Sequence, residues 1–177
     1  MLGYLMEKGI LLHICRRVCE QVREMTEMVL TDQGANAPGL QWISWTPPPR
    51  RVITANFDAE IWEDGQVTIG CVLRDNTSKL LLIAGFLGCS NVVNEAELGG
   101  AWEAIKLTGE YFPGFLLWLE GGAISVIQDL KGTSATNRPS VILEDARWLL
   151  TMLEVFRIYH TYRECNQCTH WVTKWIR

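Results

Sequence analysis

The chain has 177 residues, enough for one domain with a substantial core. Hydrophobic residues make up 48% of it and charged residues 20%, a composition that excludes disordered, collagen-like and membrane proteins. The 16 basic and 20 acidic residues give a net charge of −4. This charge excludes a dominant non-specific nucleic-acid-binding surface but still permits a local basic patch.

The beginning of the chain carries no targeting pattern that we recognise. The apolar stretch at residues 9–15 is short and leads into Arg16 and Arg17 instead of a small-residue cleavage site. No apolar run reaches the roughly 18 residues that span a bilayer. We therefore expect an intracellular protein, in the nucleus or the cytoplasm, with reduced cysteines and no membrane partner.

Residues 1–30 show the pattern of one amphipathic helix, with apolar residues at three- and four-residue steps. Its apolar stripe needs a partner, either the domain that follows or another chain. Residues 31–50 read as a linker that contains glycines and the proline run 47–49, which enforces an extended backbone. We place the folded domain at residues 51–177.

Three strand-like runs open this domain, at residues 51–57, 66–73 and 79–85. They are separated by the turn-forming residues 64–65 and 75–78, so an antiparallel meander is expected. Helices and strands alternate after the meander, which predicts an α/β domain with a mixed sheet flanked by helices. The helices are expected over 93–108, 124–130, 139–153 and 167–176, and the strands over 115–120 and 155–162.

Five short motifs follow one another from residue 45 to the C-terminus. They read WTPPP with NFDA (45–49 and 56–59), IGCVLRD (69–75), AEL (96–98), LEGGA (119–123) and RECNQCTH (163–170). In this order they resemble the ribonuclease H-like domain of plant non-LTR retroelement reverse transcriptases, which belongs to the type-1 ribonuclease H superfamily. Each motif is weak alone, but together they cover residues 45–177.

The resemblance implies a ribonuclease H-like, five-stranded mixed sheet in the order 3-2-1-4-5. It also implies hydrolysis of the RNA strand of an RNA–DNA hybrid with two Mg²⁺ ions. Two such ions clamp the attacking and leaving oxygens at phosphorus, and they need several converging carboxylates as ligands. The implied partner is nucleic acid, either a hybrid or a duplex, and the implied cofactor is Mg²⁺.

Two of the four carboxylates that this family uses are present. Asp58 and Glu97 match the first and second and are the candidate metal ligands, whereas Gly122 and His170 stand at the third and fourth positions. Without the resemblance, Asp58 reads as a turn former and Glu97 as a residue that favours a helix N-terminus. Glu120 lies on the same strand face as position 122, displaced by roughly 6–7 Å. We expect weakened Mg²⁺ binding and impaired catalysis.

The last motif also supplies candidate nucleic-acid-binding residues, Arg163 and Asn166. Arginine at this place is able to contact a phosphate, although a strand-end arginine is commonly a solvated charge. Cys165, Cys168 and His170 are ligand types that zinc accepts, but a second pair of matching spacing is absent.

Tryptophans offer a second kind of nucleic-acid contact, because bases stack on aromatic rings. Trp102, Trp118 and Trp148 fall on apolar faces and are expected in the core, whereas Trp42 and Trp45 flank the entry loop and are expected to be exposed. Trp171 and Trp175, four residues apart on the last helix, are expected to pack together.

Three functions remain open from the sequence. The first is a nucleic-acid-binding ribonuclease H-like domain of retroelement origin with impaired catalysis. The second is an active hybrid endoribonuclease that works through Asp58 and Glu97. The third is a scaffold that keeps only the fold, and a decayed retroelement product without selected function is a further alternative.

Overall fold

The computed structural model describes residues 45–134 and 140–177, which belong to one compact unit, Ile43–Arg177. The helix predicted over residues 1–30 and most of the predicted linker lie outside the described residues. Within the described part, no helix is both long and apolar enough to cross a membrane.

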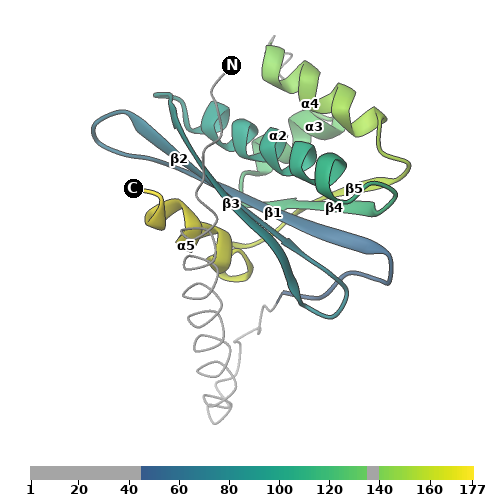
Figure 1. Ribbon diagram of the computed structural model, residues 1–177. Helices are drawn as coiled ribbons and strands as arrows, with labels where there is room; N and C mark the ends of the chain where they lie inside the picture. The colour runs from purple at the N-terminus through teal and green to yellow at the C-terminus, as the bar shows by residue number, and fades with distance from the viewer. Residues whose placement is uncertain (1–44, 135–139) are drawn as a thin grey trace, which may run out of the picture. The chain divides into compact units, whose positions relative to one another are not determined.

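A five-stranded mixed sheet forms the centre of the domain (Figure 1). Its order is β3-β2-β1-β4-β5, which confirms the predicted order. The first three strands pair antiparallel, and β4 runs parallel to both β1 and β5. The strands are β1 (Val52–Ile61), β2 (Gln66–Arg74), β3 (Leu80–Cys89), β4 (Leu116–Gly121) and β5 (Phe156–His160).

Helices cover both faces of this sheet. Figure 1 shows α2, α3 and α4 on one side and α5 on the other. A short 3-10 helix, η1, which the sequence pattern did not reveal, leads into α5. The bounds are α2 (Val93–Tyr111), α3 (Ile124–Lys131), α4 (Val141–Thr151), η1 (Arg163–Cys165) and α5 (Gln167–Trp175).

The side chains of strand β1 alternate between the two faces of the sheet. Ile53, Ala55 and Phe57 are fully buried in the apolar core under α2. Asn56, buried as well, and Asp58 project from the opposite face because successive side chains of a strand point to opposite sides. A polar row therefore runs along the centre of the sheet on the side of α5.

Helix α4 shows why one predicted core residue is exposed. Leu143, Ala146 and Leu150 form its buried stripe at helical spacing. Trp148 lies off this stripe and its side chain is 55% exposed, so the prediction that it belongs to the core is wrong. Trp171 packs with the neighbouring tryptophan of α5 at a ring separation of 5.5 Å, which confirms that prediction.

Close packing of α5 depends on glycines in the strands beneath it. A Cβ added at Gly70 of β2 would lie 2.7 Å from the backbone oxygen of Thr169 and 3.1 Å from Cβ of Val172. A Cβ at Gly85 of β3 would overlap the side chain of Ile176. The absence of side chains at these two positions lets the helix approach the sheet.

Gly70→Ala is expected to destabilise the domain by about 1–3 kcal/mol, because the overlap is with helix backbone that must move as a unit. Urea denaturation measures the change. Gly88→Ala in β3 is the matched control, since a Cβ there meets nothing within 4 Å. Equal midpoints for the two variants would contradict the close packing of α5.

Candidate active site

Asp58 lies on β1, near Gly122, the residue at which the resemblance implies a third carboxylate. The parallel register pairs Asn56 with Glu120 and ends at Phe57 with Gly121, and Asp58 and Gly122 directly follow this last pair. An added Cβ at Gly122 would find only the backbone oxygen of Thr161, at 4.0 Å. The position therefore has room for a larger side chain, and it supplies no ligand.

His170 on α5 contacts Asp58 directly. Its Nδ1 lies 2.9 Å from Asp58 Oδ2, and its Nε2 lies 3.0 Å from an Nη atom of Arg163. The side chains of His170 and Asp58 are 16% and 17% exposed, so solvent screens the contact between them only in part. His170 is thus bonded to Asp58, whereas a carboxylate at the same position would add a negative charge to the site.

Glu97 comes from the opposite face of the sheet, near the start of α2. It is 8% exposed, and its Oε2 is buried with no hydrogen-bond partner. Burial and then the negative charge of Asp58 raise the pKa of Glu97 to about 8. The carboxyl group is therefore mostly protonated at neutral pH and adds little charge to the site.

Burial also raises the pKa of Asp58, although the hydrogen bond from His170 opposes this shift. Asp58 and Glu97 interact electrostatically, so their protonation is shared between them. The site is consequently less negative than a set of converging carboxylates.

Glu120 belongs to a different cluster. Its Oε2 accepts hydrogen bonds from Asn56 Nδ2 at 2.9 Å and from Trp45 Nε1 at 3.1 Å, and the Trp45 ring in turn carries the Arg74 guanidinium at 4.6 Å. Trp45, expected to be exposed, is partly buried because it closes this cluster. Nothing in these contacts directs Glu120 toward Asp58.

Asn166 is buried and ties α5 to the sheet. Its Nδ2 donates to the backbone oxygen of Phe57 at 2.8 Å, and its Oδ1 accepts from Thr169 Oγ1 at 2.9 Å. Because Phe57 directly precedes Asp58, these bonds position His170 against that carboxylate. Arg163, by contrast, is exposed on η1. We therefore treat Asn166 as a positioning residue and Arg163 as the accessible group.

The donor set does not fit two Mg²⁺ ions. Among residues 45–134 and 140–177, no three His, Cys, Asp or Glu side chains come close enough to hold a metal ion. The same finding covers the zinc ligands considered from the sequence, Cys165, Cys168 and His170. Glu97 Oε2 is one of the buried oxygens in the described residues that have no hydrogen-bond partner, and an ionised carboxylate there is able to bind a cation.

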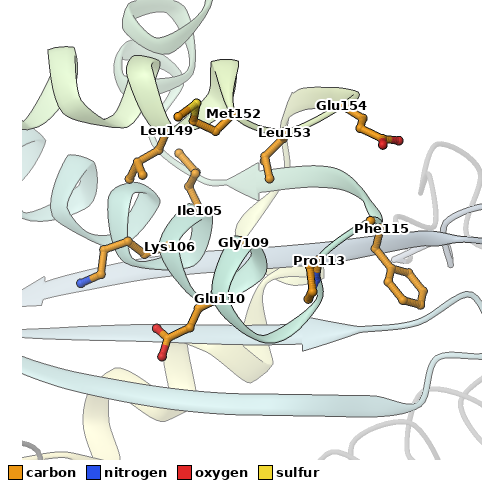
Figure 2. Close-up of a pocket in the computed structure, with 11 residues that line it drawn as sticks. Ile105, Lys106, Gly109, Glu110, Pro113, Phe115, Leu149, Met152, Leu153 and Glu154 are labelled. Carbon is orange, nitrogen blue, oxygen red and sulfur yellow. The ribbon is translucent and has the colours of Figure 1, made fainter.

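A groove of about 440 Å³ opens at the other end of α2 (Figure 2). Its apolar wall includes Leu149 of α4 and Leu153, which follows the end of that helix, and Lys106 and Glu110 of α2 line it as well. Glu110 is thirteen residues beyond Glu97, which places the groove roughly 20 Å along the helix from the carboxylates. It is therefore separate from the candidate site.

The comparisons with known proteins agree with the fold described above. The family model described as reverse transcriptase-like matches residues 56–176, most of the described domain. The chain belongs to the reverse transcriptase-like family. No curated protein gives a significant match.

Solved structures that resemble this reverse transcriptase-like domain include two ribonucleases H and a viral reverse transcriptase. Ribonuclease H1 of the archaeon Halobacterium salinarum is 24% identical with a TM-score of 0.64, covering 70% of this chain and 95% of that one. LC11-RNase H1, solved with an RNA/DNA hybrid, is 14% identical with a TM-score of 0.63, covering 69% and 94%. A foamy viral protease-reverse transcriptase, solved with double-stranded DNA, is 9% identical with a TM-score of 0.53, covering 69% and 92%. At these identities the likeness shows the ribonuclease H fold.

Proposed function

We propose that this domain binds nucleic acid, with an RNA–DNA hybrid as its preferred ligand, and that it has lost most of the hydrolytic activity of its fold. We further propose that it derives from a plant retroelement and acts inside the cell. The observation that carries the loss of activity is the pair of replacements around Asp58. Gly122 supplies no ligand, and His170 occupies an oxygen of Asp58.

Binding is supported by the fold and by the exposed charge beside Asp58. A ribonuclease H of the same fold was solved with an RNA/DNA hybrid. Arg163 presents its guanidinium at the surface next to His170. Such a group recognises a backbone phosphate by charge and by paired N–H donors.

Arg163→Ala is expected to weaken hybrid binding roughly tenfold, because one charge-assisted phosphate contact is lost. Fluorescence anisotropy with a labelled hybrid at several salt concentrations measures this. The slope of log K against log salt is expected to decrease by about one. Arg50→Ala, which removes another exposed arginine, two residues before β1 begins, is the matched control.

Equal losses for the two variants would mean that only net charge matters, and would contradict a phosphate contact at Arg163. No binding of hybrid or duplex by the unmodified protein at low salt would sink the proposed function.

The unpartnered Oε2 of Glu97 favours a second candidate, an endoribonuclease that works with one metal ion held by Asp58 and Glu97. This candidate requires cleavage of the RNA strand of a hybrid by the unmodified protein in Mg²⁺ or Mn²⁺. Asp58→Asn must then abolish the cleavage. Cleavage that survives Asp58→Asn would be attributed to a contaminating nuclease.

A further inference from the structure

A chain of hydrogen bonds links Asp58, His170 and Arg163. Asp58 Oδ2 lies 2.9 Å from His170 Nδ1, and His170 Nε2 lies 3.0 Å from the Arg163 guanidinium. The three residues come from β1, α5 and η1. Their order places an imidazole ring between one carboxylate and one guanidinium.

The proton positions follow from the partners. A guanidinium has only donors, so His170 Nε2 must accept the hydrogen bond from Arg163 and carries no proton. The ring proton is therefore on Nδ1, from which it is donated to Asp58 Oδ2. His170 is thus a neutral bridge, and the positive charge that faces Asp58 through it belongs to Arg163.

Several contacts hold this bridge in place. Asn166 donates to the backbone oxygen of Phe57, the residue before Asp58. The backbone amide of His170 donates to the backbone oxygen of Asn166 at 3.1 Å, so His170 stands one helical turn from the residue that is bonded to β1. Gly70 leaves the space that this approach needs.

We propose that Arg163, acting through His170, is the built-in counter-charge of Asp58, so that the domain keeps its site folded and holds nucleic acid without a divalent cation. The part of this proposal that concerns nucleic acid rests on the proposed function above. A metal ion at Asp58 Oδ2 would have to displace the His170 N–H, and Gly122 offers it no replacement ligand.

Thermal unfolding of the full chain, in chelator and in excess Mg²⁺, tests the counter-charge. The unmodified protein is expected to give the same Tm in both. His170→Asp is expected to lower the Tm in chelator by on the order of 2–4 °C for each kcal/mol of added repulsion with Asp58, and Mg²⁺ is expected to restore it. Gln128→Glu, which adds one negative charge at an exposed position of α3 on the other side of the sheet, controls for the introduced charge and should show no Mg²⁺ response.

Calorimetric titration of Mn²⁺ into the unmodified protein decides the matter even if a variant fails to fold. No binding heat is expected. Binding that Asp58→Asn removes would overturn the proposal, and so would a Tm of the unmodified protein that Mg²⁺ raises.

Hybrid binding separates this inference from the proposed function. We expect equal affinity in chelator and in Mg²⁺ at matched ionic strength. Binding that requires Mg²⁺ would overturn the inference and leave the proposed function standing. Absence of all binding, with a metal-insensitive Tm, would overturn the proposed function and the nucleic-acid part of the inference, while the counter-charge would stand.

Discussion

Gly122→Asp combined with His170→Asp is expected to produce a Mg²⁺-dependent hybrid nuclease from a domain that we propose has lost most of this activity. The double replacement restores carboxylates at both positions beside Asp58 and Glu97. Position 122 accepts a side chain, because an added Cβ meets only the Thr161 backbone oxygen, at 4.0 Å. Cleavage of a labelled hybrid in Mg²⁺, with sizing of the products, measures the effect.

The expected gain is on the order of 100-fold or more. Metal ligation contributes several kcal/mol to stabilising the charge that develops at phosphorus, and each ~1.4 kcal/mol is worth tenfold in rate. Either replacement alone is expected to give less than the pair, since the ligands act together.

The matched control is the double replacement with Asp58→Asn added, which must be inactive if the new activity arises at this site. Gly121→Ala is not a suitable neighbouring control, because a Cβ there would overlap the buried Phe57 ring. Cleavage by the unmodified protein that Asp58→Asn stops would refute the loss of activity and favour the single-metal enzyme.

Stability is expected to fall as the pH rises from about 4.5 to about 8, with Glu97 as the main cause. The pKa of Glu97 is raised from 4.5 to about 8 in the folded state by burial and then by Asp58. The folded chain therefore binds this proton more tightly than the unfolded chain does. The stability from this proton is complete below pH 4.5 and is lost as the pH passes through about 8.

The loss amounts to on the order of 3–5 kcal/mol, given about 1.4 kcal/mol for each pH unit by which the pKa is raised. Burial also raises the pKa of Asp58, which changes stability in the same direction. Glu97→Gln removes the main titration while keeping the shape of the side chain. Its free energy of unfolding is expected to change much less between pH 5 and pH 8 than that of the unmodified protein.

Denaturant titration at a series of pH values measures both curves. Glu95→Gln, an exposed position of the same helix, is the control and should follow the unmodified protein. Parallel curves for the unmodified protein and Glu97→Gln would show that Glu97 is not the buried acid that the packing of α2 implies.

The strands, helices and their order along the chain could be predicted from the sequence because they depend on local patterns. Asp64-Gly65 closes the first hairpin with a positive φ of 78° at Gly65, and Asp75 accepts bonds from the Thr77 and Lys79 amides in the second turn. The sheet order was predicted through the motifs, and the structure confirms it. Turns, helices and strands depend on residues that are close together in the sequence, so the local pattern is enough to predict them.

The tertiary structure decided how the candidate residues meet. His170 and Asp58 are 112 positions apart, and Asn166 and Phe57 are 109 apart, so no local pattern reveals either hydrogen bond. Asn166 was expected to face nucleic acid, and packing places it inside the domain as a tie to β1. Glu120 was considered near the metal site, and its bonds instead lie with Asn56 and Trp45.

The sequence by itself thus determined which residue types stand at the four motif positions, two carboxylates, a glycine and a histidine, since residue identity alone answers that question. Only the folded structure decided that His170 bridges Asp58 to Arg163 and that Glu97 Oε2 is buried without a hydrogen-bond partner. The physical reason is that hydrogen-bond partners and burial depend on where α2 and α5 pack on the sheet. That packing is set by side-chain volumes on elements far apart in the chain, including the missing side chain at Gly70.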